Sequence, residues 1–264
     1  MKETEYIEHS GMKHGISWIA LKAALETEGC PVCNVMRSSV KRYFEFLLYE
    51  SALDAEVHKK NLSSFGMCNI HSKLLKETEY KLNSDGLNIA VLYETLLKKE
   101  IKLLNEITEI KLKKGGRFLK KLDDKRKYIN YKKEILLKMK VKEICLGCLQ
   151  QKQSEAFYTH EIIRSFNDND FRKLYSNQKT LLCRRHFLFL INETTNREVL
   201  DFFVEHQIQK ITILSEQLSG FIDHHDYRFS DLISDDERKS WEEVLRYTGS
   251  DESISKESTN DLLV

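Results

Sequence analysis

The sequence predicts an all-α protein made of two helical repeats, each held together by a metal clamp. One proline and ten glycines among 264 residues leave few chain breakers, a composition that favours helices. Apolar residues recur every three or four positions along several long stretches, which is the spacing of an amphipathic helix. Two short motifs, Cys-x2-Cys and Cys-x2-His, each occur twice and use all six cysteines of the chain.

The motifs recur at a constant offset along the chain. Adding 115 to the numbers of the first four motif residues gives the last four, in the order Cys30, Cys33, Cys68, His71 and Cys145, Cys148, Cys183, His186. We interpret the chain as an internal duplication of one unit, with 34 residues between its two motifs. The expected domains are a first repeat at 1–114, a basic linker with two glycines at 115–125, a second repeat at 126–249 and a disordered tail at 250–264.

These eight residues are the predicted metal ligands. Three thiolates and one imidazole suit a closed, tetrahedral zinc site, so two structural zinc ions are expected, with an iron–sulfur cluster as the alternative. A Cys-x2-Cys motif fits a turn that opens into a helix, and Pro31 suits the first position of that helix. We expect each set to close within its own repeat. A swapped arrangement, in which Cys30 and Cys33 join Cys183 and His186, stays open.

Other interpretations of the cysteines fit less well. A thioredoxin-like dithiol ordinarily needs a cis-proline beside the active site, and Pro31 is the only proline. Covalent haem attachment needs histidine directly after the second cysteine, where this chain has Asn34 and Leu149. Buried structural cysteines explain an isolated pair but not eight residues in two matching sets.

Both repeats are expected to run in the order helix, clamp, helical hairpin, clamp, long helix. In the first repeat the sequence predicts helices over 15–28 and 32–48, a break near 50–54, a short helix to about 82 and a long helix over 87–113. The core face of that long helix is predicted to hold Ile89, Tyr93, Leu96, Leu97, Leu104 and Ile107. The matching helix over 196–223 is predicted to turn inward Leu200, Val204, Ile208, Ile211, Leu214, Leu218 and Phe221.

Charge and hydropathy exclude some classes of protein. The 42 basic and 41 acidic residues nearly cancel, so the whole chain has no bias toward nucleic acid or membrane. The N-terminal residues lack the apolar stretch of a signal peptide, and no apolar run approaches the roughly 20 residues that span a bilayer, so we expect a soluble, cytoplasmic protein. Nucleotide-binding loops and a serine-hydrolase elbow are absent, and a saturated four-ligand site has no place for substrate, so nothing indicates an enzyme.

Two segments carry alternative functions. Residues 111–142 contain 14 basic and three acidic residues beside Phe118, Tyr128 and Tyr131, which resembles a nucleic-acid footprint. Lysine runs are more often solvated linkers and helix faces, which is the interpretation that we favour. His224, His225 and Asp226 could form another metal or acid–base site. Adjacent histidines on a helix point in different directions, however, and no third ligand is identifiable.

The order of the motifs, followed by Asp226-Tyr227-Arg228-Phe229, Trp241 and Gly249, resembles a family of uncharacterised prokaryotic proteins with paired CxxC and CxxH motifs and a terminal D-Y-R segment. The resemblance spans residues 15–249. It implies a helical, metal-binding protein and brings no established activity. We therefore expect a zinc-stabilised binding or adaptor protein whose partner is another protein; an iron–sulfur or thiol redox protein, or a nucleic-acid binder using residues 111–142, are the alternatives. Its oligomeric state is left open.

Overall fold

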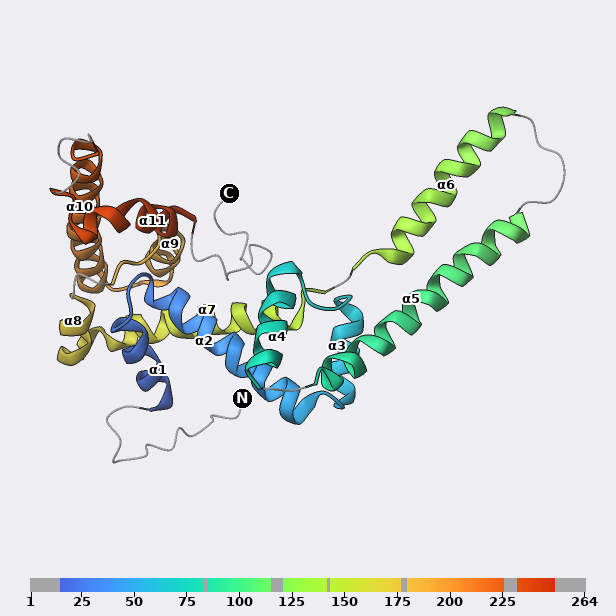
Figure 1. The fold of residues 1–264 in the computed structure, drawn as a ribbon, viewed down its shortest axis with the longest axis horizontal. Helices are drawn as coiled ribbons and strands as arrows, with labels where there is room; N and C mark the ends of the chain where they lie inside the picture. The colour runs from blue at the N-terminus through green and yellow to red at the C-terminus, as the bar shows by residue number, and fades with distance from the viewer. Residues whose placement is uncertain are drawn as a thin grey trace. The chain divides into compact units, whose positions relative to one another are not determined.

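The computed structural model describes residues 15–82, 85–114, 121–141, 143–176, 180–225 and 232–249 (Figure 1). Over these residues every regular element is a helix, which confirms the all-α prediction. The helices are α1 (Ile16–Leu25), α2 (Pro31–Phe46), α3 (Ala55–Ser63), α4 (Asn69–Lys81), α5 (Leu87–Lys114), α6 (Lys121–Met139), α7 (Leu146–Arg164), α8 (Asn169–Tyr175), α9 (Arg184–Glu193), α10 (Arg197–Asp223) and α11 (Asp235–Gly249), with short turns η1 (Leu47–Ser51) and η2 (Ser165–Asn167).

Helix boundaries follow the local chemistry of the chain. Pro31 opens α2, where its fixed backbone angle suits a first helical position. Asp54 caps α3 by accepting hydrogen bonds from the backbone amides of Glu56 and Val57. Asn196 caps α10 in the same way. None of the described helices is long and apolar enough to cross a membrane.

The described chain divides into two compact units. The first takes residues 15–39 and 152–249, and the second takes residues 40–151. The first is built on a core that includes Leu21, Leu25, Met36, Phe171, Tyr175 and Phe203. The second is built on a core that includes Val40, Phe44, Leu47, Leu75 and Leu92. Each unit thus has a core of its own, and α2 and α7 contribute residues to both. The internal duplication itself stays a prediction.

The long helices form where expected, but part of each predicted core face is wrong. On α5, Leu96 and Ile107 are buried, whereas Leu97 is 58% exposed and Leu104 is 45% exposed. On α10, Ile208 is 61% exposed. The residues of α10 that are buried are Val199, Phe203, Gln207, Lys210 and Leu214. Two of these are polar, so apolar periodicity alone includes Leu214 but misses Gln207 and Lys210.

The buried polar residues of α10 hold a loop in place. Gln207 donates its side-chain amide to the carbonyl of Leu182 at 2.8 Å. The Lys210 Nζ donates to the carbonyl of Tyr175 and, at 2.8 Å, to Thr180 Oγ1, and it lies 4.2 Å from the centre of the Tyr175 ring. These bonds satisfy polar groups of the residues that precede α9.

Burial lowers the pKa of Lys210 to about 7, from an ordinary value of 10.5. Between these two values the unfolded chain binds a proton that the folded chain does not, so this group makes folding more favourable as pH rises through that range. Below pH 7 both states are protonated and the group gives no pH dependence. The difference in free energy of unfolding between the wild type and Lys210→Met should therefore shift in favour of the wild type between pH 6.5 and 9. Urea unfolding at both pH values measures the shift; a constant difference contradicts it.

Candidate metal centres

The eight predicted ligands meet in two groups of four. Site A consists of Cys30, Cys33, Cys183 and His186, and site B consists of Cys68, His71, Cys145 and Cys148. In each group the four donor atoms all lie within 4.8 Å of one another, so each site could hold a metal ion. The expected pairing within each repeat is wrong. Each site takes its Cys-x2-Cys motif from one repeat and its Cys-x2-His motif from the other, which is the swapped arrangement.

Each of the four motifs lies at the start of a helix. The carbonyls of Cys30, Cys68, Cys145 and Cys183 accept the first helical hydrogen bonds of α2, α4, α7 and α9, at 2.8 to 3.0 Å. The second ligand of each motif then lies in the first turn of the same helix, close enough to share one ion with the first. Because helix N-termini carry partial positive charge, this placement also favours the thiolate form of the cysteines. Each site therefore joins two helix starts.

Distances between donor atoms fit tetrahedral metal coordination. Sulfur–sulfur separations are 3.9 Å for Cys33 and Cys183 in site A and 3.8 Å for Cys68 and Cys148 in site B. Zinc–sulfur bonds at the tetrahedral angle place two sulfurs about 3.8 Å apart, whereas a disulfide needs about 2.05 Å. In both sites histidine Nδ1 faces the cysteines, with separations of 3.2 to 3.4 Å from their sulfurs. The donor set is thus spaced for a metal.

The pKa shifts of the ligand side chains also fit a metal site. Burial alone would lower the pKa of His71, but bonds with the Cys145 and Cys68 sulfurs outweigh it and raise that pKa to about 9. The pKa of His186 is likewise raised by Cys183 and Cys30 against the effect of burial. Hydrogen bonds from neighbouring thiols strongly lower the pKa values of Cys68 and Cys183. Each site therefore pairs a cysteine that readily loses its proton with a histidine that readily takes one, and a divalent ion would displace the protons that the donor atoms share.

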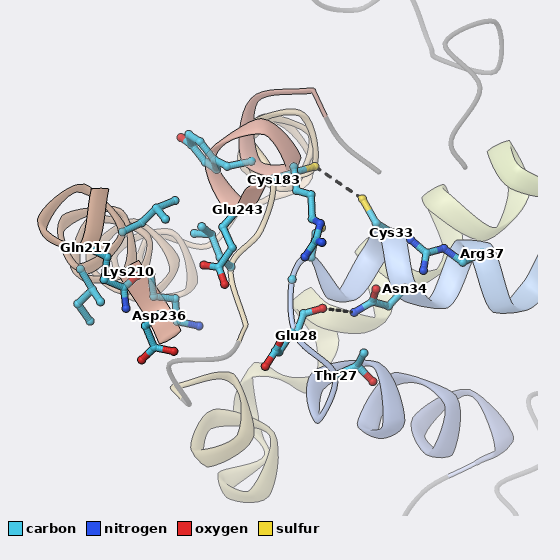
Figure 2. Close-up of a pocket in the computed structure, with 17 residues that line it drawn as sticks. Thr27, Glu28, Cys33, Asn34, Arg37, Cys183, Lys210, Gln217, Asp236 and Glu243 are labelled. Carbon is cyan, nitrogen blue, oxygen red and sulfur yellow. Dashed lines mark hydrogen bonds between the residues drawn. The ribbon is translucent and has the colours of Figure 1, made fainter. Parts of the chain in front are cut away.

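Two loops deliver the ligands of site A. Gly29, directly before Cys30, has φ of +93°, a left-handed conformation that glycine adopts without strain. Its carbonyl accepts a hydrogen bond from the amide of Leu181 at 3.2 Å, which ties together the segments before α2 and α9. Asn34 also donates to the carbonyl of Glu28 at 3.1 Å (Figure 2). The approach to both helix starts is thus fixed by backbone contacts.

Site A has a polar outer layer that sequence reasoning missed. His186 Nε2 donates to Glu155 Oε1 at 3.1 Å, and Arg185 binds both oxygens of that carboxylate at 2.6 and 2.8 Å. Burial alone would raise the pKa of Glu155, but His186 and Arg185 lower it overall, so the carboxylate is ionised. A carboxylate of this kind fixes the ring of a metal-binding histidine and leaves Nδ1 free to bind. Nothing in the sequence places Glu155 beside His186.

Site B has an apolar outer layer instead. Among the residues that the structure describes, the buried Nε2 of His71 has no hydrogen-bond partner. The ring of Phe44 lies edge-on to the His71 ring with 6.1 Å between centres. On the other ligand helix, Gly147 lies so close that a β-carbon there would sit 2.4 Å from His71 Cγ. Burial, together with the charge of Cys145, raises the pKa of Tyr43 to about 12. The two sites thus have the same types of ligand but different surroundings.

A cavity of about 630 Å³ adjoins site A (Figure 2). The three cysteines of site A form part of its lining, and helices α10 and α11 form another part. The charged residues of the lining are Glu28, Arg37, Lys210, Asp236, Glu243 and Arg246. Burial and the nearby charge of Glu28 raise the pKa of Glu243. The cavity therefore offers groups of both charges whose protonation its surroundings alter.

The remaining predicted residues do not form a site in the described chain. His224 Nδ1 lies 3.4 Å from Glu237 Oε1, and Glu237 accepts hydrogen bonds from Ser234 that cap α11. His225 packs against the ring of Phe221. Outside the described residues lie Asp226, the D-Y-R segment, linker residues 115–120 and the tail at 250–264.

The basic segment at 111–142 is only partly described. The backbone forms the end of α5 and all of α6, but the side chains of residues 108–127 lie outside the described part. Of the aromatic residues noted there, Tyr128 is exposed and Tyr131 is partly buried, with its hydroxyl 3.5 Å from the carbonyl of Ile107. Nucleic-acid binding by this segment stays a prediction.

Comparison with known proteins yields one match. The model of a family described as "Family of unknown function (DUF6062)" matches residues 12–252. No curated protein and no solved structure matches the chain.

Proposed function

We propose that this protein, which belongs to the family of unknown function DUF6062, is a zinc-stabilised helical adaptor that acts by binding another protein. Two zinc ions, one in each site, would join the starts of α2 and α9 and of α4 and α7. Three thiolates and one imidazole saturate a tetrahedral ion, so such sites stabilise a fold and leave no position for a substrate. Function is then expected on a surface rather than at the metal.

One observation carries the protein-binding part of the proposal. Residues Leu97, Ile101 and Leu104 of α5 are spaced by four and three, which places them on one stripe of the helix. All three are exposed, by 45 to 58%. On α6, exposed apolar residues are also frequent, namely Tyr128, Ile129, Leu136 and Leu137. Single exposed leucines are ordinary, but a stripe of them supports our proposal that another protein covers this surface.

Site-specific crosslinking tests this proposal. A photo-reactive benzoylphenylalanine replaces Ile101 in the stripe or, as the control, Glu205 on the exposed side of α10. We expect a discrete protein adduct in cells from position 101 only, and its loss when Leu97→Glu is added. Equal labelling from both positions contradicts the proposal. Adducts only between copies of this chain indicate self-association in its place.

Elemental analysis of anaerobically purified protein tests the metal. The proposal requires two zinc equivalents per chain and a colourless solution. Iron with absorption near 400 nm would establish the iron–sulfur alternative, since clusters of that kind are held by cysteine thiolates. Protein that folds with neither metal contradicts both the zinc proposal and the iron–sulfur alternative.

A second candidate function, binding of a small charged molecule, is favoured by the cavity beside site A. Lys210 and Glu243 both line the cavity. The pKa of Lys210 is lowered and the pKa of Glu243 is raised, so both shift toward pH 7. Thermal-shift screening with charged metabolites compares the wild type with Glu243→Gln. A ligand that stabilises only the wild type supports this function, and equal response of both proteins opposes it.

A further inference from the structure

The two sites contain matched pairs of cysteines in different surroundings. Cys68 and Cys148 of site B occupy the same motif positions as Cys183 and Cys33 of site A, at the offset of 115. The sulfur–sulfur distances are nearly equal, at 3.8 and 3.9 Å. Any difference in reactivity between the pairs must therefore come from access and from the outer contacts of each site, not from the spacing of the sulfurs.

Access differs between the pairs. Cys68 is partly exposed, whereas the other five cysteines are buried, with at most 8% of the residue exposed. Its counterpart in site A, Cys183, is 1% exposed. The cavity beside site A approaches its cysteines without exposing them to the same degree. A reagent dissolved in water thus reaches residue Cys68 more readily than any other cysteine residue.

The histidines also differ in how they are held. His186 is anchored through Glu155 and Arg185, whereas the buried His71 Nε2 has no partner within the described part of the chain. Positions 40 and 70, which correspond to 155 and 185, carry Val40 and Ile70. Loss of such an outer carboxylate typically weakens metal binding 10- to 100-fold. Site B therefore lacks an anchor that would slow the release of its metal.

We propose that site B is an oxidation site, in which a peroxide reacts at Cys68 and a disulfide with Cys148 then expels the metal. The inference rests on the proposed zinc in site B. The Cys68 thiolate attacks one peroxide oxygen, so a sulfur–oxygen bond forms and the oxygen–oxygen bond breaks. The Cys148 thiolate then displaces that oxygen as hydroxide and forms the sulfur–sulfur bond. Two thiolates, one hydrogen peroxide and two protons give one disulfide and two water molecules.

Disulfide formation leaves His71 and Cys145 as the remaining ligands of site B. Two donors do not make a structural zinc site, so the ion leaves. The start of α4 then stays tied to α7 through the new bond, although the metal is gone. Site A keeps its zinc under the same conditions, because its cysteines are buried and its histidine is anchored. Oxidation thus converts a protein with two metal ions into one with a single ion.

The test uses the whole chain of 264 residues, first shown to hold two zinc ions. Hydrogen peroxide is added in steps, zinc release is followed with a chromogenic chelator, and disulfides are located by peptide mass mapping. We expect the first zinc to leave at least tenfold faster than the second, together with a Cys68–Cys148 disulfide. Dithiothreitol and added zinc should restore the ion that site B released, which would show that the oxidation is reversible.

Glu155→Gln supplies the matched control, because it removes the charge that anchors His186 and leaves all eight ligands in place. In this variant the slower zinc should leave about tenfold faster, while release of the first zinc is unchanged. Equal release of both ions from the wild type, or a Cys33–Cys183 disulfide that forms first, overturns the inference but leaves the zinc proposal standing. A chain that holds no zinc before peroxide is added overturns both.

Discussion

Cys148→Ser is expected to lower the melting temperature by roughly 10 °C and to reduce helical content. The variant removes one of four ligands of site B, and with it the ion that would join the starts of α4 and α7. Loss of a structural metal ranks among the changes that cost about 3 kcal/mol or more, and each kcal/mol moves the melting temperature of a chain of this size by about 2–4 °C. Cys33→Ser should likewise lower the melting temperature and the helical content, because it removes a ligand of site A.

Circular dichroism with and without a zinc chelator measures both effects. Thr248→Ser, a conservative change at an exposed position near the end of α11, is the control and should melt like the wild type. Chelator should destabilise the wild type strongly and each cysteine variant less, because one ion is already lost there. Unchanged melting in both cysteine variants would falsify the claim that the sites hold structural metal.

Gly147→Ala should destabilise the protein and remove the zinc of site B, against the ordinary effect of this substitution in a helix. Alanine normally stabilises a helix by about 1 kcal/mol relative to glycine. Here the new β-carbon would lie 2.4 Å from Cγ and 2.7 Å from Cδ2 of His71. The His71 ring, which lies edge-on to the Phe44 ring, would have to move away from Gly147 and so from its ligand position. We therefore expect about one zinc equivalent per chain and a lower melting temperature.

Gly249→Ala supplies the control, since no atom of the described residues lies within 4 Å of a β-carbon built there. It should keep both zinc ions and the wild-type melting temperature. Position 32, which corresponds to 147 at the offset of 115, already carries Val32, so the close approach is special to site B. A Gly147→Ala protein with two zinc ions and higher stability would show that His71 is not a ligand.

The residues of the two candidate sites and the helix starts could be predicted because they depend on local sequence. A Cys-x2-Cys or Cys-x2-His motif has one geometry that serves a metal, and Pro31 marks where α2 opens. All four motifs do lie at helix starts. Composition also sufficed for the fold class, since few breakers leave long helical stretches.

Pairing of the motifs could not be derived in the same way. The 34 residues between Cys33 and Cys68 are long enough to return to their starting point, so spacing permits closure within a repeat. The cores of both units, however, combine helices from distant parts of the chain, and that packing decides which motifs meet. Connectivity among cysteine ligands is a property of the tertiary fold, which motif spacing does not contain.

The outer contacts were missed for a related reason. Glu155 lies 31 residues before His186 and reaches it only because α7 and α9 pack within one unit. The prediction for α10 included Leu214 but missed Gln207 and Lys210, which are buried for their hydrogen bonds to Leu182 and Tyr175. Hydropathy does not report a polar side chain whose partner is a backbone carbonyl elsewhere in the chain.

Zinc content of two double variants tests the swapped pairing most directly. Cys30→Ser with Cys183→Ser damages site A twice and leaves site B intact, so the protein should keep one zinc per chain. Cys30→Ser with Cys68→Ser removes one ligand from each site, so neither ion should be held tightly. Closure within each repeat requires the reverse, with one zinc in the second variant and none in the first, and that result would contradict the account.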